Sequence, residues 1–480
     1  MSFDFKTFKE QFDREAVKLM REQSVPGLSV LITKENEVIY DRSFGSREWQ
    51  GGKPANSDTI YGIASMTKSI TCVAILQLQE QGKLNINDPI SKYIPVTIGF
   101  PNQPITIHHL MCHASGIPSL HDYVFPILNE ELFESNQPKF PMGNWDDFYF
   151  HINDAKDEVI SKPGEKFYYF NGGFTLLSQI VAKVSGIKYE DYVKQNILIP
   201  LQMFRSTFSR EDLEKDSNAS KGYDSKQVDK KLKRSPKPHL VGPFNSGAGG
   251  LNSTVKELTN YLQFHLNEGN VDGKQLLSKE SILEMRKPHN KNLKTDSFLL
   301  NNSQRAYGYG LSVYENYHGY TLISHSGASG VSGGVIGFIP ELKLTFAMLY
   351  NVGWMSLHLM DLALVLLMGK SPDDEIPFFK RRKHINRIIG IYEGYKKVIT
   401  ATIKYENNML VLETIDITKE TLPLIPKDIT DPECMNFYVF MPYGIMDVDF
   451  RRDINDNIIF EFERNLMHKV AVTNEKNLDN

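Results

Sequence analysis

Hydrophobic and polar positions along the first 370 residues predict an alternation of helices and strands. Apolar side chains at helical spacing over residues 5–22 predict an opening helix, and two apolar runs joined at Glu35 and Asn36 predict a hairpin. The largely apolar run 70–82 predicts a buried helix ending at Gly82, a residue that readily takes the left-handed conformation of a helix terminus. Further helices are predicted at 173–185, 188–196 and 254–267, and two late strands at 334–340 and 344–351. Because strands stand at both ends of a helical middle, the pattern favours an α+β domain whose two ends share one sheet.

The pattern changes after residue 370. The polar, proline-bearing segment 371–384 predicts a linker. From 385 to 480, short strand-like runs are separated by Asn-Asn and Asp-Asn turn pairs, which predicts a small antiparallel β-barrel. The chain is therefore expected to hold an α+β domain at 1–370, a linker and a barrel domain.

Composition and charge narrow the class of function. The chain has 480 residues with 54 basic and 58 acidic side chains, and its formal net charge of −4 offers no long-range attraction to nucleic acid or an anionic membrane. The three cysteines are too few and too widely spaced for a disulfide framework or a zinc site. The first residues lack the apolar core of a secretory signal, and the apolar run 355–368 is too short to span a membrane. We expect a soluble, cytoplasmic protein that binds neither nucleic acid nor membrane, and we interpret the basic run 226–239 as a solvated loop.

The pattern S-x-x-K, which can pair a nucleophilic serine with its own base, occurs three times. The pairs are Ser65 with Lys68, Ser185 with Lys188, and Ser253 with Lys256. Ser185 stands at a predicted helix end, so its lysine need not share a helical face, and Ser253 precedes a helix-capping pattern. Both are interpreted as structural, which leaves the first pair.

Ser65 and Lys68 lie where a buried helix is predicted to begin. Their i, i+3 spacing places both on one helical face. A lysine at the base of an apolar helix loses solvation, which lowers its pKa and favours the neutral amine that can accept a proton from a hydroxyl group. The alternative is an ordinary serine helix cap beside a lysine that reaches solvent, and this segment alone does not decide between the two.

Two later motifs carry groups that such a serine would need. Tyr169 and Asn171, spaced Y-x-N before a predicted helix, offer a proton relay and an amide for binding a substrate. In H-S-G at 325–327, His325 ends a predicted strand and Gly327 lets a ligand approach the backbone closely. Either motif alone would more often be structural.

In this order, S-M-T-K, Y-F-N and H-S-G resemble the three motifs of the serine β-lactamase and penicillin-binding-protein family, in the class C β-lactamase, esterase and CubicO-type branch. The segments L-M-C-H-A-S-G-I-P at 110–118 and S-G-A-G-G-L-N-S-T-V-K-E-L at 246–258 are similar to further stretches of that family. The resemblance covers about residues 10–370. It implies the family's fold, an antiparallel sheet flanked by helices, followed here by the small barrel.

The resemblance also implies a role for each motif residue. Ser65 would be the acylated nucleophile and Lys68 its base. Tyr169 would be the general acid and base for the leaving group and for deacylation. The backbone N–H groups of Ser65 and Ala328 would form the oxyanion hole.

The remaining motif residues would bind and orient the substrate. Asn171 and His325 would position the substrate and tune the tyrosine, with Gly327 completing the H-x-G element. No metal or organic cofactor is implied. His113, in L-M-C-H-A-S-G, is expected to belong to a scaffold turn without a catalytic task.

Two other functions compete with this interpretation. G-V-S-G-G at 330–334 matches the G-x-S-x-G motif of α/β-hydrolases with Ser332 as nucleophile, but it runs into a strand rather than opening a helix. The second is a catalytically silent penicillin-binding fold used as a scaffold or sensor. Such a protein would be expected to have lost one of the motif residues.

The sequence leaves two substrate classes open, small peptides or amides and short acyl esters. One enzyme would be an intracellular peptidase or amidase acting on small peptides, including those with D-residues, and the other a carboxylesterase acting on short acyl esters. The C-terminal barrel resembles the lipocalin-like domain of some archaeal and bacterial CubicO-type peptidases, where it helps the chains assemble. That resemblance favours the peptidase and implies a homo-oligomer.

Overall fold

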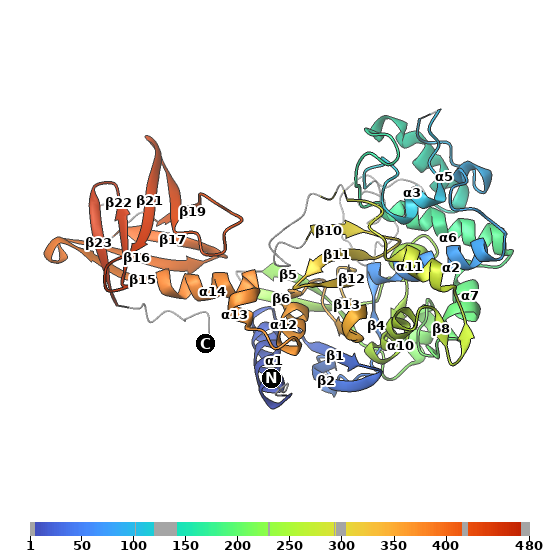
Figure 1. Cartoon of the computed structure of the whole chain (residues 1–480), viewed down its shortest axis with the longest axis horizontal. Helices are drawn as coiled ribbons and strands as arrows, with labels where there is room; N and C mark the ends of the chain where they lie inside the picture. Colours follow the sequence, from blue (N-terminus) through green and yellow to red (C-terminus); the bar gives the residue numbers. More distant parts are fainter. Residues whose placement is uncertain are drawn as a thin grey trace. The chain divides into compact units, whose positions relative to one another are not determined.

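The computed structural model, shown in Figure 1, describes residues 5–100, 102–119, 142–228, 231–291, 293, 304–414 and 421–471. The chain divides into two compact units, a larger one formed mainly by residues 9–360 and a smaller one formed mainly by residues from 361 onward. The expected domain boundaries, 1–370 and 385–480 with a linker between, stay predictions. Each unit is described by itself below.

The larger unit is built on an eight-stranded antiparallel sheet. Its strands, in spatial order, are β10 (Gln304–Tyr307), β11 (Ser312–Tyr317), β12 (Tyr320–Ala328), β13 (Gly333–Ile339), β14 (Leu344–Tyr350), β1 (Gly27–Lys34), β2 (Glu37–Glu48) and β3 (Lys53–Pro54). The turn from β1 to β2 is made by Glu35 and Asn36, both with positive φ. Because β1 pairs with β14, the prediction that the two ends of this domain share a sheet is confirmed.

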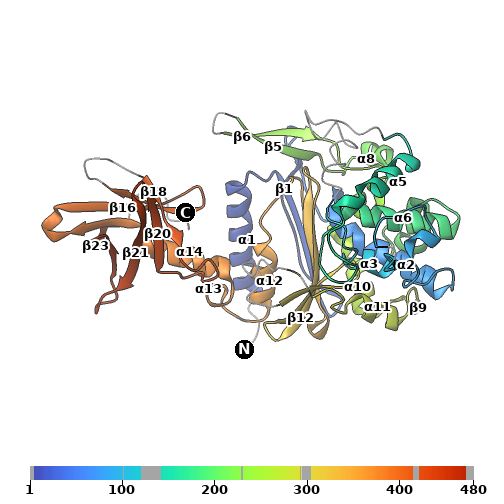
Figure 2. The ribbon, with the colours of Figure 1, turned by 90° about the horizontal axis from the view of Figure 1, so that it is seen from above.

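Helices cover both faces of this sheet, which explains the nearly continuous apolar runs of its central strands. Figure 2 shows α1 (Phe5–Glu22) against one face, where the ring of Phe12 packs edge-on against Tyr40 of β2. The opposite face carries α10 (Val255–Leu266), which contacts β1, β13 and β14. Every residue of β13 and β14 is buried as a result.

Beyond α10 lies a helical layer that shares one apolar core with the sheet. It contains α2 (Thr67–Glu80), α3 (Ile107–Met111), α5 (Trp145–Asp154), α6 (Asn171–Ser185), α7 (Tyr189–Val193), α9 (Ser246–Gly249) and α11 (Lys279–Met285). The short helix α8 (Arg210–Lys215) contributes no residue to that core. As predicted, α2 is buried along nearly its whole length, and Gly186 ends α6 with a φ of 78°. The helix predicted at 188–196 is α7 continued by the π-helical turn η4 (Lys194–Leu198).

Short elements complete the larger unit. They are the helical turns η1 (Ala64–Met66), η2 (Ile90–Lys92), η3 (Ala155–Glu158) and η5 (Pro340–Leu342), and the strand pairs β4 (Tyr61–Gly62) with β7 (Asn252–Ser253) and β8 (Asn270–Val271) with β9 (Lys274–Gln275). The helix α12 (His358–Leu367) follows the sheet in the chain.

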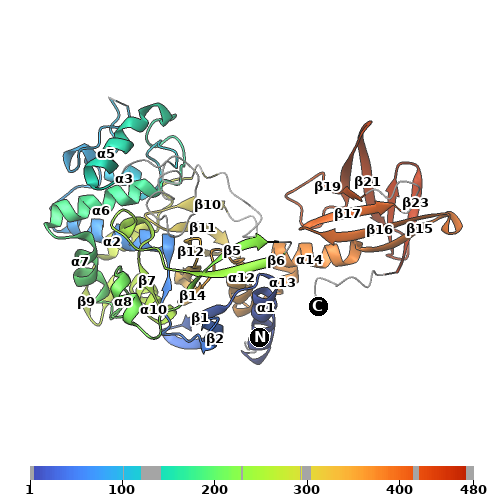
Figure 3. The same cartoon turned by 180° about the vertical axis from the view of Figure 1, so that it is seen from behind.

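The basic run 226–239 was wrongly interpreted as a loop. It belongs to a hairpin of β5 (Gly222–Val228) and β6 (Lys231–Lys237), drawn as two long green strands in Figure 3. The Arg234 guanidinium donates to the backbone carbonyls of Gln23 and Ser24, which ties the hairpin to the chain after α1. Strand pairing and this anchor hold a lysine-rich segment whose sequence shows no apolar alternation.

The smaller unit is a nearly closed, nine-stranded antiparallel barrel. In spatial order its strands are β18 (Thr421–Pro423), β17 (Met409–Thr414), β16 (Ile399–Glu406), β15 (Gly390–Gly394), β23 (Asn465–Ala471), β22 (Ile458–Phe462), β21 (Gly444–Arg452), β20 (Asn436–Met441) and β19 (Ile425–Pro426). The first and last strands of this order are joined through Leu424, whose N–H donates to Leu410 O. The predicted barrel is therefore confirmed.

The barrel is filled by its own side chains. In its core Phe450 stacks on Phe460, and Tyr392 meets both rings edge-on, with the Tyr392 and Phe460 ring centroids 5.1 Å apart. The segment 371–384, predicted as a linker, carries the short α13 (Pro372–Glu375) and the start of α14 (Pro377–Ile388), and η6 (Tyr395–Lys397) follows β15. Across the described part of the chain, no helix is both long and apolar enough to cross a membrane.

Candidate active site

Ser65 stands at a sharp bend between β4 and α2. The preceding residue, Ala64, has a φ of +47°, and the turn η1 leads directly into α2. Ser65 is partly exposed, whereas its neighbours Ala64 and Met66 are buried. The first backbone hydrogen bond of this turn is donated by the Met66 N–H to Ile63 O. The Ser65 N–H therefore lies among the amides at the start of a helix that have no acceptor within the helix.

Lys68 is fully buried beside this serine. Its Nζ lies 3.0 Å from Ser65 Oγ and donates to Ala248 O at 2.7 Å. Among the described residues no carboxylate pairs with it. Burial therefore holds the pKa of Lys68 well below its usual value. The predicted loss of solvation is present, and the alternative of a lysine that reaches solvent is wrong.

The H-x-G strand lies against the serine bend. A Cβ atom at Gly327 of β12 would come within 2.2 Å of Ile63 O and 3.0 Å of Ser65 N, so glycine is what allows this approach. The next residue, Ala328, is exposed and pairs with Gly333 of β13. Ala328 follows directly after the glycine that approaches Ser65 N, and the oxyanion hole formed by the N–H groups of Ser65 and Ala328 stays a prediction.

Tyr169 reaches the same region from the loop before α6. The Lys68 Nζ lies 4.9 Å from the centroid of the Tyr169 ring, and the rings of Tyr169 and His325 are 6.4 Å apart. Asn171 is the first residue of α6 and is partly exposed. The structure thus brings Ser65 and Lys68 close to Tyr169 and to His325 and Gly327 of β12. The place of Asn171 in this site and the chemical role of every one of these residues stay predictions.

Sequence reasoning missed Tyr307. This fully buried residue of β10 has its hydroxyl 2.8 Å from His325 Nε2. His325 Nδ1 lies 2.6 Å from the carbonyl of Ser326, which can only accept, so Nδ1 carries the proton and Nε2 accepts from Tyr307. Burial, with a smaller effect of the Lys68 charge, lowers the pKa of His325 to about 3. Tyr307 lies in A-Y-G-Y-G, outside S-M-T-K, Y-F-N and H-S-G, so none of these motifs pointed to it.

The competing serines have structural contacts. Ser332 is fully buried between β12 and β13, where its Oγ donates to Gly62 O at 3.1 Å. Ser185 Oγ donates to carbonyls at the end of α6. Ser253 Oγ lies 2.7 Å from Ser206 Oγ, and the next residue, Thr254, caps α10. These contacts match the structural interpretation of Ser185 and Ser253.

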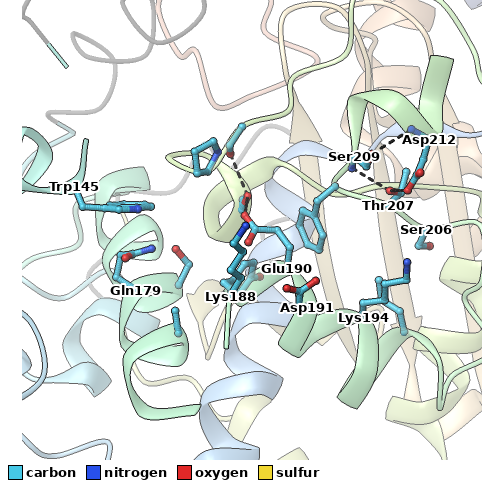
Figure 4. Close-up of a pocket in the computed structure, with 18 residues that line it drawn as sticks. Trp145, Gln179, Lys188, Glu190, Asp191, Lys194, Ser206, Thr207, Ser209 and Asp212 are labelled. Atoms are coloured by element: carbon cyan, nitrogen blue, oxygen red, sulfur yellow. Dashed lines mark hydrogen bonds between the residues drawn. The ribbon is translucent and has the colours of Figure 1, made fainter. Parts of the chain in front are cut away.

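A separate cavity of about 620 Å³ lies between α6, α7 and the segment before α9. Figure 4 shows its charged side chains, among them Lys188, Glu190 and Lys194, with a Glu190 carboxylate oxygen accepting from Ser246 Oγ. Neither Ser65 nor Lys68 lines it, so it is distinct from the site above. Within the described ranges no three His, Cys, Asp or Glu side chains are grouped as metal ligands.

Two family models match the chain. The model described as Beta-lactamase matches residues 12–353. The chain belongs to the Beta-lactamase family. A second model, described as Pab87 octamerisation domain, matches residues 372–468 of this family member.

Individual relatives agree with that assignment. A solved structure, the octameric penicillin-binding protein homologue from Pyrococcus abyssi, is 34% identical with a TM-score of 0.82, and the match covers 96% of this chain and 99% of that one. A class C β-lactamase structure, 18% identical with a TM-score of 0.60 and matching 77% of this chain and 97% of its own, shares the fold. Protein flp of Staphylococcus aureus (strain MW2) is 29% identical over 262 residues, 54% of this chain and 49% of flp. The chain thus spans about half the length of this curated relative.

Proposed function

We propose that the chain is a serine hydrolase that acts through an acyl-enzyme on Ser65, most simply a peptidase or amidase on small peptides, including those with D-residues. The observation that carries the proposal is the buried Lys68 amine 3.0 Å from Ser65 Oγ. Its lowered pKa favours the neutral form, which is the form able to accept a proton. A catalytically silent scaffold would have no need for a buried lysine that, among the described residues, has no carboxylate partner.

Acylation would begin with proton transfer from Ser65 Oγ to Lys68 Nζ. One amine N–H continues to donate to Ala248 O, which leaves the lone pair for the serine hydroxyl. Ser65 Oγ then attacks the substrate carbonyl carbon, and the N–H groups of Ser65 and Ala328 stabilise the oxyanion. Tyr169 gives a proton to the departing amine or alcohol and later takes one from the water that hydrolyses the acyl-enzyme.

Covalent labelling tests the nucleophile. A fluorophosphonate probe should label the native chain, and Ser65→Ala should abolish labelling. Ser332→Ala should leave it intact, because that hydroxyl is buried against Gly62 O. Retained labelling of the Ser65→Ala protein at a specific site would refute the assignment.

The second candidate is a carboxylesterase on short acyl esters, since the same catalytic groups serve both reactions. A small-molecule ester or peptide is the proposed substrate in either case. Rates on p-nitrophenyl acetate, on D- and L-aminoacyl amides and on short peptides separate the two. Hydrolysis of esters alone would favour the carboxylesterase and remove the peptidase.

We further propose that the chain forms a homo-oligomer in the cytoplasm. The match of residues 372–468 to an octamerisation domain supports the assembly. The exposed cross-strand pair Phe440 and Ile445 on β20 and β21 offers an apolar surface for it. Three free, buried cysteines suit a reducing compartment. Fractionation of cells that produce the protein would test the location.

A further inference from the structure

His113 holds the backbone on both sides of Tyr169. It follows α3 in a turn where its φ is +56°. Its carbonyl accepts the Tyr168 N–H at 3.0 Å, and its ring Nδ1 accepts the Phe170 N–H at 3.0 Å. The backbone N–H groups of the residues before and after Tyr169 are therefore both bound by one residue from a different element.

The imidazole ring of His113 also packs directly on Tyr169. The two ring centroids are 4.2 Å apart, and those of Tyr307 and Phe174 lie at 4.9 and 5.1 Å. His113 is 1% exposed, so solvent cannot take over any of these contacts. A change of this ring would move the tyrosine both through its backbone and through its side chain.

The ring acts in its neutral form, as an acceptor. An amide N–H can only donate, so Nδ1 must be unprotonated where it meets the Phe170 N–H. Burial, followed by the charge of Lys68, lowers the pKa of His113 well below its usual value. Nε2 has no hydrogen-bond partner among the described residues, which is unfavourable for a buried polar atom. A residue that only filled space here would avoid that cost, so the benefit of histidine lies in Nδ1.

We propose that His113 is a positioning residue that sets Tyr169 for proton transfer to the leaving group. This inference rests on the proposed function, because it assigns Tyr169 a catalytic proton. None of the described contacts of His113 is with Ser65, and it acts through the Phe170 N–H and the packing of the two rings. A displaced Tyr169 slows departure of a basic leaving group most, because p-nitrophenolate departs without needing a proton.

The test compares His113→Leu with His113→Asn. Leucine removes the acceptor, whereas the Oδ1 atom of asparagine can accept from the Phe170 N–H near the position of Nδ1, and asparagine tolerates a positive φ better than other side chains. Values of kcat/KM are measured for p-nitrophenyl acetate and ethyl acetate. Each is divided by the concentration of sites that a fluorophosphonate labels, so that misfolded protein does not count.

For His113→Leu we expect kcat/KM on ethyl acetate to fall about 10- to 100-fold more than on p-nitrophenyl acetate. For His113→Asn we expect both values to stay within about threefold of the native ones. Equal losses on the two esters in His113→Leu, or the same leaving-group dependence in both variants, would overturn the inference and leave a scaffold role. Failure of the proposed function is recognised separately, by undiminished labelling or turnover in Ser65→Ala.

Discussion

Burial of Lys68 lowers the stability of the folded chain, and the same burial suits its amine to the proposed proton transfer. In the unfolded chain this amine is protonated below its usual pKa, whereas the folded site favours the neutral form. The unfolded state therefore binds more protons, and stability falls as the pH drops from about 10.5 toward the folded pKa. The cost arises from the same burial that suits Lys68 to the proposed role of base.

Replacing Lys68 with methionine tests this cost. Lys68→Met keeps a side chain of similar volume and removes the titrating amine. The midpoint temperature of thermal unfolding of the variant should therefore exceed that of the native chain by more at pH 7 than at pH 10. The other titrating groups are common to the two proteins. The Lys68 charge also affects the pKa of His113 and His325, but burial is the larger cause that keeps both rings neutral in the folded chain, so their contributions largely cancel between pH 7 and pH 10. Scanning calorimetry at both pH values measures the difference in midpoint, and an unchanged difference would show that burial does not disfavour the charged lysine.

Tyr307 gives a second prediction at the scale of a residue. Tyr307→Phe removes the donor to His325 Nε2 and leaves a buried acceptor unpaired, at a cost of about 1–3 kcal/mol in unfolding free energy. Because the His325 ring loses its fixed orientation, kcat/KM should fall as well. The control is Tyr392→Phe, which loses a hydrogen bond to Ile388 O inside the barrel. A loss of stability without any kinetic change in Tyr307→Phe would mean that His325 orientation does not matter for turnover.

At the scale of the elements, the close approach of β12 to the start of α2 depends on Gly327, which has no Cβ atom. Gly327→Ala would place a Cβ atom 2.2 Å from Ile63 O, so the strand must move away from Ser65. We expect at least a tenfold slower fluorophosphonate labelling, since displacements of about 1 Å in such sites can cost about 100-fold in rate. Gly51→Ala, where the nearest atom is 3.5 Å away, is the matched control and should label at the native rate.

The sequence predicted those elements whose signals are local. Gly82 and Gly186 marked helix ends, and the apolar runs of β1, β13 and β14 marked buried strands. The motif residues could be proposed from the sequence because each stands in a short pattern of its own, and their roles stay predictions. Tyr307 and His113 were not found as partners of the site, because their roles depend on which strand and turn face His325 and Tyr169, and this is set by tertiary packing.

Tertiary packing also accounts for the wrong prediction of a loop at the β5–β6 hairpin. Lysine and proline in 226–239 are poor strand formers, and pattern alone favours a loop. What holds β6 in place is the Arg234 guanidinium on the carbonyls of Gln23 and Ser24, more than two hundred residues earlier in the chain. A contact between residues so far apart in the chain cannot be predicted from a short segment of sequence.

For the whole molecule, the proposed assembly predicts a mass several times that of one chain by light scattering. Phe440→Ser combined with Ile445→Ser removes the apolar pair on β20 and β21, and this double variant should shift the population toward smaller species. The melting temperature of the native protein should also rise with its concentration, because association stabilises the folded chains. A monomeric mass at micromolar concentration would contradict the assembly.

The pairing of β1 with β14 has a consequence for synthesis of the chain. Leu28 meets Tyr350, so roughly 320 residues must be made before β1 gains this neighbour. At ribosomal rates of about 5–20 residues per second, this takes about 15 to 60 s. During that interval the nascent β1–β2 hairpin presents an apolar, unpaired strand edge that can join other chains. Yield in the cell should therefore depend on chaperones and on growth temperature more than the stability of the finished fold would indicate.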